Sequence, residues 1–141
     1  MATFNKFQAF VEHVSEGVHD LGADTLKIML TNTAPVAANA IKADLTEIGA
    51  GNGYTAGGTA ATISSSSQTA GTYKLVLADV VFTASGGTIG PFRYAVLYND
   101  TPTSPADPLI GWWDYASAVT LQTGESFTVD FNASTGVLTS T

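Results

Sequence analysis

The chain has 141 residues, of which only 12% are charged, and twelve carboxylates against five basic residues give a formal net charge of −7. A chain of this length fits one domain, so we interpret residues 1–141 as a single domain. The few basic residues are scattered, which excludes a basic patch for nucleic acid. The absence of cysteine excludes disulfides, thiolate catalysis and Cys-ligated zinc.

The first expected element is an amphipathic helix over residues 3–21. Apolar side chains recur there at spacings of three and four, which is the helical period. They are Phe4, Phe7, Phe10, Val11, Val14, Val18 and Leu21. We expect this stripe to pack inward and Gly22 to end the helix. The chain has neither a signal-peptide pattern nor an apolar run long enough to span a bilayer, so we expect no membrane association.

Residues 25–141 are predicted to be β-rich. Residues 25–32 alternate apolar and polar side chains, as in a half-buried strand. Residues 33–58 are rich in turn formers, and only 41–48 suggests a short element. We interpret 33–58 as a long, loop-rich excursion and a first candidate contact region. We hypothesise that it becomes ordered on binding.

The densest apolar runs lie between residues 72 and 115, with a Gly86–Gly87 turn and a proline-rich loop over 99–108. Further strands are expected over 59–66, 72–84, 92–98, 109–115, 119–121, 126–131 and 136–139. This pattern predicts a mainly β protein, an antiparallel β-sandwich or barrel of about 7–9 short strands with one N-terminal amphipathic helix.

Aromatic side chains provide the candidate interface. Adjacent strand residues point to opposite faces, so one of Trp112 and Trp113 is expected in the core and the other on an outer face. There it either forms an interface or is covered by a helix or loop. Residues 94–98 are apolar on both faces, and the N-terminal helix or a neighbouring subunit could cover them. The candidate interface residues are Trp112, Trp113, Tyr115, Tyr94, Tyr98 and Tyr54.

No pattern points to catalysis or to a cofactor. His13 and His19 lie about 240° apart on the predicted helix, so they are expected to be solvated rather than to bind zinc together. The glycines of 49–58 match neither the dinucleotide nor the phosphate-loop pattern. Carboxylates in predicted strands near aromatics, at Asp79, Asp114 and Asp130, could serve a glycosidase, yet they fit equally well as outward strand residues. We predict a non-enzymatic protein with no catalytic, cofactor-binding or metal-binding residues.

Several motifs together resemble a family of small virion structural proteins of tailed bacteriophages. They are the Phe-rich N-terminal segment, residues 24–35 (DTLKIMLTNTAP), residues 51–54 (GNGY), residues 94–100 (YAVLYND) and residues 111–115 (GWWDY). The resemblance spans nearly the whole chain, and its motifs are structural rather than catalytic.

The resemblance implies a protein built into the phage particle after assembly in the host cytoplasm. A capsid decoration or cement role fits best, with the major capsid protein and other copies of the chain as partners. Such proteins are commonly homo-oligomers, most often trimers. A tail or head-tail component remains the alternative, and a carbohydrate-binding module with Trp112 or Trp113 as a stacking platform is a further one.

Overall fold

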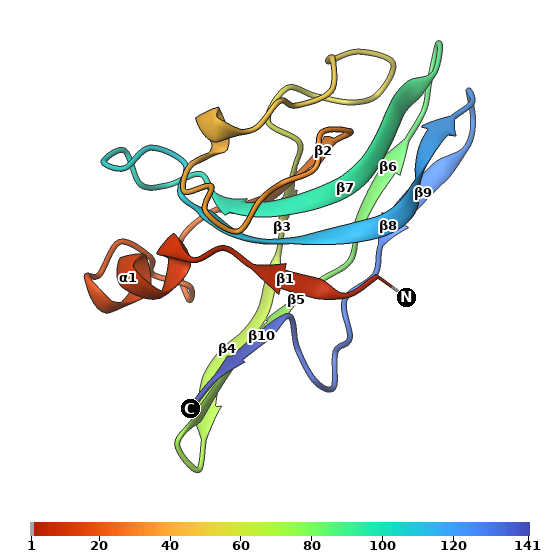
Figure 1. The fold of residues 1–141 in the computed structure, drawn as a ribbon. Helices are drawn as coiled ribbons and strands as arrows, with labels where there is room; N and C mark the ends of the chain where they lie inside the picture. Colours follow the sequence, from red (N-terminus) through yellow and green to blue (C-terminus); the bar gives the residue numbers. More distant parts are fainter. Residues whose placement is uncertain (1) are drawn as a thin grey trace.

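The computed structural model describes residues 2–141, which form a β-sandwich with one short helix (Figure 1). The helical elements are α1 (Ala9–Ser15) and the 3₁₀ turn η1 (Lys42–Asp44). The strands are β1 (Phe4–Lys6), β2 (Leu26–Thr31), β3 (Thr59–Ala61), β4 (Ile63–Thr69), β5 (Thr72–Leu77), β6 (Val80–Thr83), β7 (Ile89–Asn99), β8 (Leu109–Leu121), β9 (Ser126–Val129) and β10 (Leu138–Ser140).

These strands form three antiparallel sheets, with the orders β1-β8-β7-β2-β3, β10-β5-β4 and β6-β9. The predicted fold class is therefore confirmed. The strands predicted over 59–66 and 72–84 each divide in two, because the chain passes from one sheet to another at Thr62 and at Ala78–Asp79. Asp79 occupies the second corner, where its carboxylate accepts the N–H of Phe131 over 2.9 Å.

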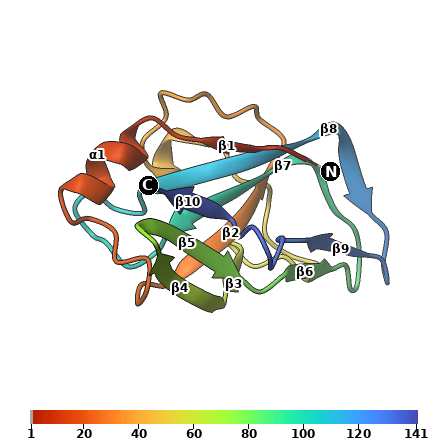
Figure 2. The ribbon, with the colours of Figure 1, turned by 90° about the horizontal axis from the view of Figure 1, so that it is seen from below.

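The main core lies between the five-stranded sheet and the two smaller sheets. Figure 2 shows β4, β5, β6 and β9 on the same side of β7 and β8. Alternate residues of β2, Leu26, Ile28 and Leu30, point into this core and are fully buried. The alternation read in residues 25–32 therefore sets the register of β2 against β7, with Ile28 opposite Leu97.

The other face of the large sheet is also covered. Met29, Val96 and Tyr98 form a second apolar cluster there, closed by Phe7 and by Leu45 of the 33–58 segment. The expectation of a half-buried β2 was wrong, because Met29 on its second face is fully buried. The cover expected over residues 94–98 comes from this chain itself, through the stretch around Phe7 and through 33–58.

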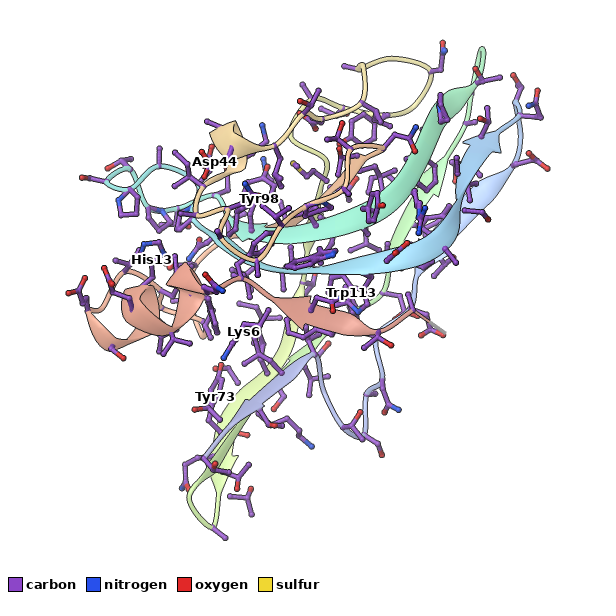
Figure 3. All side chains as sticks on the ribbon, in the orientation of Figure 1. Lys6, His13, Asp44, Tyr73, Tyr98 and Trp113 are labelled. Carbon is purple, nitrogen blue, oxygen red and sulfur yellow. The ribbon has the colours of Figure 1, made fainter. Side chains whose placement is uncertain are left out.

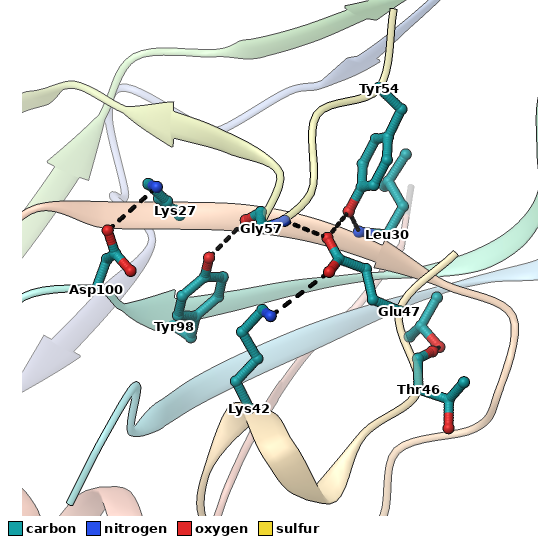
Figure 4. Close-up of polar contacts among 10 residues, drawn as sticks. Lys27, Leu30, Lys42, Thr46, Glu47, Tyr54, Gly57, Tyr98 and Asp100 are labelled. Carbon is teal, nitrogen blue, oxygen red and sulfur yellow. Dashed lines mark hydrogen bonds and ion pairs between the residues drawn. The ribbon is translucent and has the colours of Figure 1, made fainter. Parts of the chain in front are cut away.

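Polar contacts fasten the 33–58 segment to the sheet (Figure 4). Glu47 accepts the hydroxyl of Tyr54 over 2.5 Å and the N–H of Gly57 over 2.7 Å, and its other oxygen lies 3.5 Å from Lys42 Nζ. The hydroxyl of Tyr98 donates to the carbonyl of Gly57 over 2.5 Å. The segment has one 3₁₀ turn and no strand, as its loop-rich composition predicts, yet it packs as part of the fold.

The helix predicted over 3–21 is shorter, because residues 4–6 pair with β8 as a strand. Phe4 lies opposite Trp113. The Phe4 ring packs over Gly111, because a Cβ at position 111 would lie only 2.3 Å from this ring. Gly17, at φ +76°, ends α1 well before Gly22. The N–H groups of Gly17 and Val18 donate to carbonyls in the last turn, which is a Schellman motif.

Candidate functional site

The six aromatic residues predicted as an interface separate into buried and accessible groups. Tyr54, Tyr94, Tyr98 and Trp113 are at most 8% exposed and belong to the core. Burial raises the pKa of Tyr54 and of Tyr98 well above the ordinary value, so both hydroxyls act as neutral donors. Trp112 and Tyr115 are half-buried, and they are the two of the six whose side chains remain available to a partner.

The two tryptophans do point to opposite faces of β8, as predicted. Trp113 enters the main core, where its ring centroid lies 5.1 Å from that of Phe4 and 5.5 Å from that of Phe131. Trp112 lies on the second face, with its ring 4.6 Å from that of Phe7. The outer tryptophan is therefore partly covered by the stretch before α1 rather than standing free.

A cavity of about 610 Å³ opens beside the inner tryptophan, and we name it the aromatic cavity. Its apolar wall is formed by Phe4, Trp113, Tyr115, Phe131 and Val137, and its polar rim includes Asp114, Thr128, Asp130, Asn132 and Thr135.

Its two carboxylates differ in availability. Asp114 is held by Arg93 through bonds of 2.8 and 3.1 Å, and this contact keeps the pKa of the Asp114 carboxyl below its usual range. Among residues 2–141, neither the Asp130 carboxylate nor the Tyr115 hydroxyl has a hydrogen-bond partner. Burial, followed by the nearby charge of Asp130, raises the pKa of Tyr115 to about 12. The cavity therefore offers a free neutral hydroxyl and a free carboxylate beside aromatic rings.

A larger groove of about 940 Å³ lies between α1 and the chain's last strand, and we name it the α1–β10 groove. Val11 and Val14 of α1 line it and are 52% and 43% exposed. Lys6 of β1, Tyr73 of β5 and Leu138 of β10 line its other sides. Figure 3 labels Lys6 on the β1 side of this groove and Tyr73 on its β5 side.

The sequence pattern did not identify this groove. The predicted helix placed Val11 and Val14 on an inward stripe, but a helix of seven residues buries only Phe10 of its own side chains. The signal that could have found the groove is Gly17, because a helix ending near it has too few turns to bury every apolar side chain between residues 10 and 21.

The two histidines lie near each other, contrary to the expectation of solvated side chains pointing apart. The expectation failed because His19 lies beyond the end of α1, and the chain turns back so that its ring centroid is 6.0 Å from that of His13. His19 Nδ1 lies 3.1 Å from Asn99 Nδ2, which also donates to Asp24 over 2.7 Å. Within the described part of the chain, no cluster of three or more His, Asp or Glu side chains could hold a metal ion.

Comparison with known proteins yields no match to a family model, to a curated protein or to a solved structure. Of the helices that residues 2–141 contain, none has the length and apolar character needed to cross a membrane.

Proposed function

We propose that this chain is a non-enzymatic virion structural protein of a tailed bacteriophage, and that it decorates the head by binding the major capsid lattice. The observation that carries the proposal is the α1–β10 groove, where Val11 and Val14 remain exposed. An apolar groove of this kind is typical of a protein-binding surface.

The motifs that carry the family resemblance also support a structural role. Tyr54, Tyr94, Val96, Tyr98 and Trp113 come from three of these motifs, and all are buried side chains of the two apolar clusters or of the strands beside them. These residues maintain the shape of the protein, so the resemblance and the fold are consistent with a structural protein that acts by binding through its surface.

Adhesion would act through many weak contacts. Each square ångström of apolar surface removed from water contributes about 25 cal/mol. If one copy, or a homo-oligomer such as a trimer, contacts several capsid subunits at once, these contributions add through multivalency. Because the contacts form only in the assembled lattice, they would stabilise the head against the outward pressure of packaged DNA.

Immunogold labelling of intact particles with an antibody to this chain tests the proposal. Gold at many positions over the head is the expected result. Gold confined to the tail would favour the alternative, a tail or head-tail component. Particles without gold, from a lysate in which the antibody detects the chain, would contradict both readings.

The aromatic cavity favours a second candidate, a carbohydrate-binding module. Sugars are bound by aromatic faces together with hydroxyl and carboxylate groups, and the half-buried Phe4 and Tyr115, together with Asp130, supply these groups around one cavity. Titration with oligosaccharides while tryptophan fluorescence is recorded separates the candidates. A saturable change that Asp130→Asn abolishes would support the module, whereas the decoration role predicts no change.

A further inference from the structure

We propose that the free edge of β1 accepts an extended strand from a partner protein, and that a carboxylate of this strand pairs with Lys6. The inference rests on the proposed function in one respect, because it takes the partner to be another protein of the particle. Three features of the α1–β10 groove support it: unpaired backbone groups, exposed apolar side chains and one free positive charge.

The backbone of β1 presents unpaired groups to the groove. β1 is one of the two outer strands of the five-stranded sheet, and within residues 2–141 it pairs with β8 alone. The Phe7 N–H donates to the Ile110 carbonyl over 3.1 Å, and backbone groups alternate in direction along an antiparallel ladder. The N–H and C=O groups of Asn5 therefore face β8, and those of Phe4 and Lys6 face away from it. An added strand would bond to these outward groups.

The far side of the groove carries a second free edge. β10 is one of the two outer strands of the three-stranded sheet, and in the described part of the chain it pairs only with β5. Leu138 of β10, with Val11 and Val14 of α1, gives the groove an apolar lining. A strand along β1 would point alternate side chains onto this lining, which explains why apolar side chains remain exposed at this place in a short helix.

The charge of Lys6 indicates which kind of side chain the added strand should carry. Lys27, Lys42 and Arg93 form ion pairs with Asp100, Glu47 and Asp114 over 3.1, 3.5 and 2.8 Å, and Lys74 donates to the Ser134 carbonyl over 2.9 Å. In residues 2–141, Lys6 is the one basic side chain with no such partner, and it lies exposed at the groove. The exposed Asp20 also lines the groove, so the carboxylate of the strand must lie opposite Lys6 and away from Asp20 to be complementary to this edge.

Hydrogen exchange measured by mass spectrometry on the free protein and on particles that carry it tests the inference. In the free protein, the amides of Phe4 and Lys6 should exchange fast, because no group within residues 2–141 accepts their hydrogen bonds. In particles, the segment around β1 should gain slow exchange at these two positions. If α1 becomes protected while Phe4 and Lys6 still exchange fast, the groove binds a partner without strand addition, and the inference is overturned although the proposed function stands.

Variants separate the backbone contribution from the charge. Lys6→Gln should weaken co-sedimentation with particles lacking the protein by about two- to fivefold, as for loss of one exposed ion pair. Lys6→Pro removes the outward N–H as well as the charge, and it should weaken co-sedimentation further. An edge strand tolerates proline where the N–H faces solvent. Lys74→Gln is the matched control for net charge and should bind as the wild type does. Equal binding of all variants would overturn the inference and leave Lys6 the role of protecting the edge from aggregation.

Discussion

The hydroxyl of Tyr54 donates to the carboxylate of Glu47 over 2.5 Å, and the Tyr54 hydroxyl oxygen accepts the backbone N–H of Leu30 over 3.0 Å. Leu30 belongs to β2, whereas Tyr54 and Glu47 belong to the 33–58 segment. Tyr54 is 2% exposed, so these bonds lie away from water. The Tyr54 hydroxyl therefore joins the 33–58 segment to the central sheet, beside the bonds from Tyr98 to Gly57 and from Ile48 to Leu30.

Replacing Tyr54 by phenylalanine should lower the free energy of unfolding by about 1–3 kcal/mol, because the buried Leu30 N–H loses its acceptor and Glu47 keeps only Gly57 and Lys42 as partners. Urea unfolding of wild type and variant measures the change. Tyr115→Phe is the matched control, since the Tyr115 hydroxyl has no partner within residues 2–141, and it should cost less than about 0.5 kcal/mol. Equal losses in the two variants would refute the role given to the Tyr54 hydroxyl.

The same bonds bear on whether 33–58 is ordered in the free protein. The Gly57 N–H donates to Glu47 over 2.7 Å, and its carbonyl accepts from Tyr98, which is 1% exposed. We therefore expect slow exchange of the Gly57 amide in the free protein and little change on binding. Fast exchange that slows only in particles would instead support the hypothesis that the segment orders on binding.

Gly58 should not tolerate a side chain. It has φ +83°, and a Cβ would lie 1.9 Å from the Ile28 carbonyl oxygen and 2.8 Å from Met29 Cα. Because these are backbone atoms of the central β2, they cannot move without disrupting the sheet. We expect Gly58→Ala to destabilise the fold by more than about 3 kcal/mol.

Gly49, in the same segment, is the matched control. A Cβ there meets nothing within 4 Å and the residue has no left-handed backbone, so Gly49→Ala should be neutral or slightly stabilising. Thermal unfolding of both variants decides the matter. A Gly58→Ala protein as stable as Gly49→Ala would show that the loop does not pass so close to β2.

Sequence reasoning succeeded where burial alternates over several residues. Leu26, Ile28 and Leu30 were assigned to the core from their period, and the central strands β7 and β8 from the density of apolar residues. Such patterns predict a strand because each face meets one environment. Trp112 and Trp113 were assigned to opposite faces for the same reason, although the sequence left open which of them is the core residue.

Sequence reasoning failed where a contact distant in sequence decides the local structure. Phe4 and Phe7 fit a helical period, but pairing with Trp113 and Gly111 of β8 draws this stretch into a strand. The contact partners of Tyr54 and Tyr98 likewise lie in the loop and sheet that meet only after folding. The aromatic cavity and the α1–β10 groove both arise from elements more than a hundred residues apart, so neither could be derived from local spacing.

His19 should make stability depend on pH in mildly acidic solution. Burial first, and then the charge of His13, lowers the pKa of His19 from 6.5 to about 4, against an opposing contribution from Asp24. Between these pH values the unfolded chain binds a proton that the folded chain does not, so the free energy of unfolding falls as the pH drops from 6.5 toward 4. The loss should be about 1–3 kcal/mol, reduced by the partial exposure of the ring.

Urea unfolding at several pH values, for wild type and for His19→Gln, measures this dependence. The variant cannot take up the proton, so its stability should change less between pH 6.5 and pH 4.5. Asp44 and Asp114 have pKa values lowered from 3.8, so they titrate below this range. The raised pKa of Asp107 increases the free energy of unfolding as the pH falls, which opposes the effect of His19 equally in both proteins. Parallel pH profiles for the two proteins would show that His19 is protonated as easily in the folded chain as in the unfolded one.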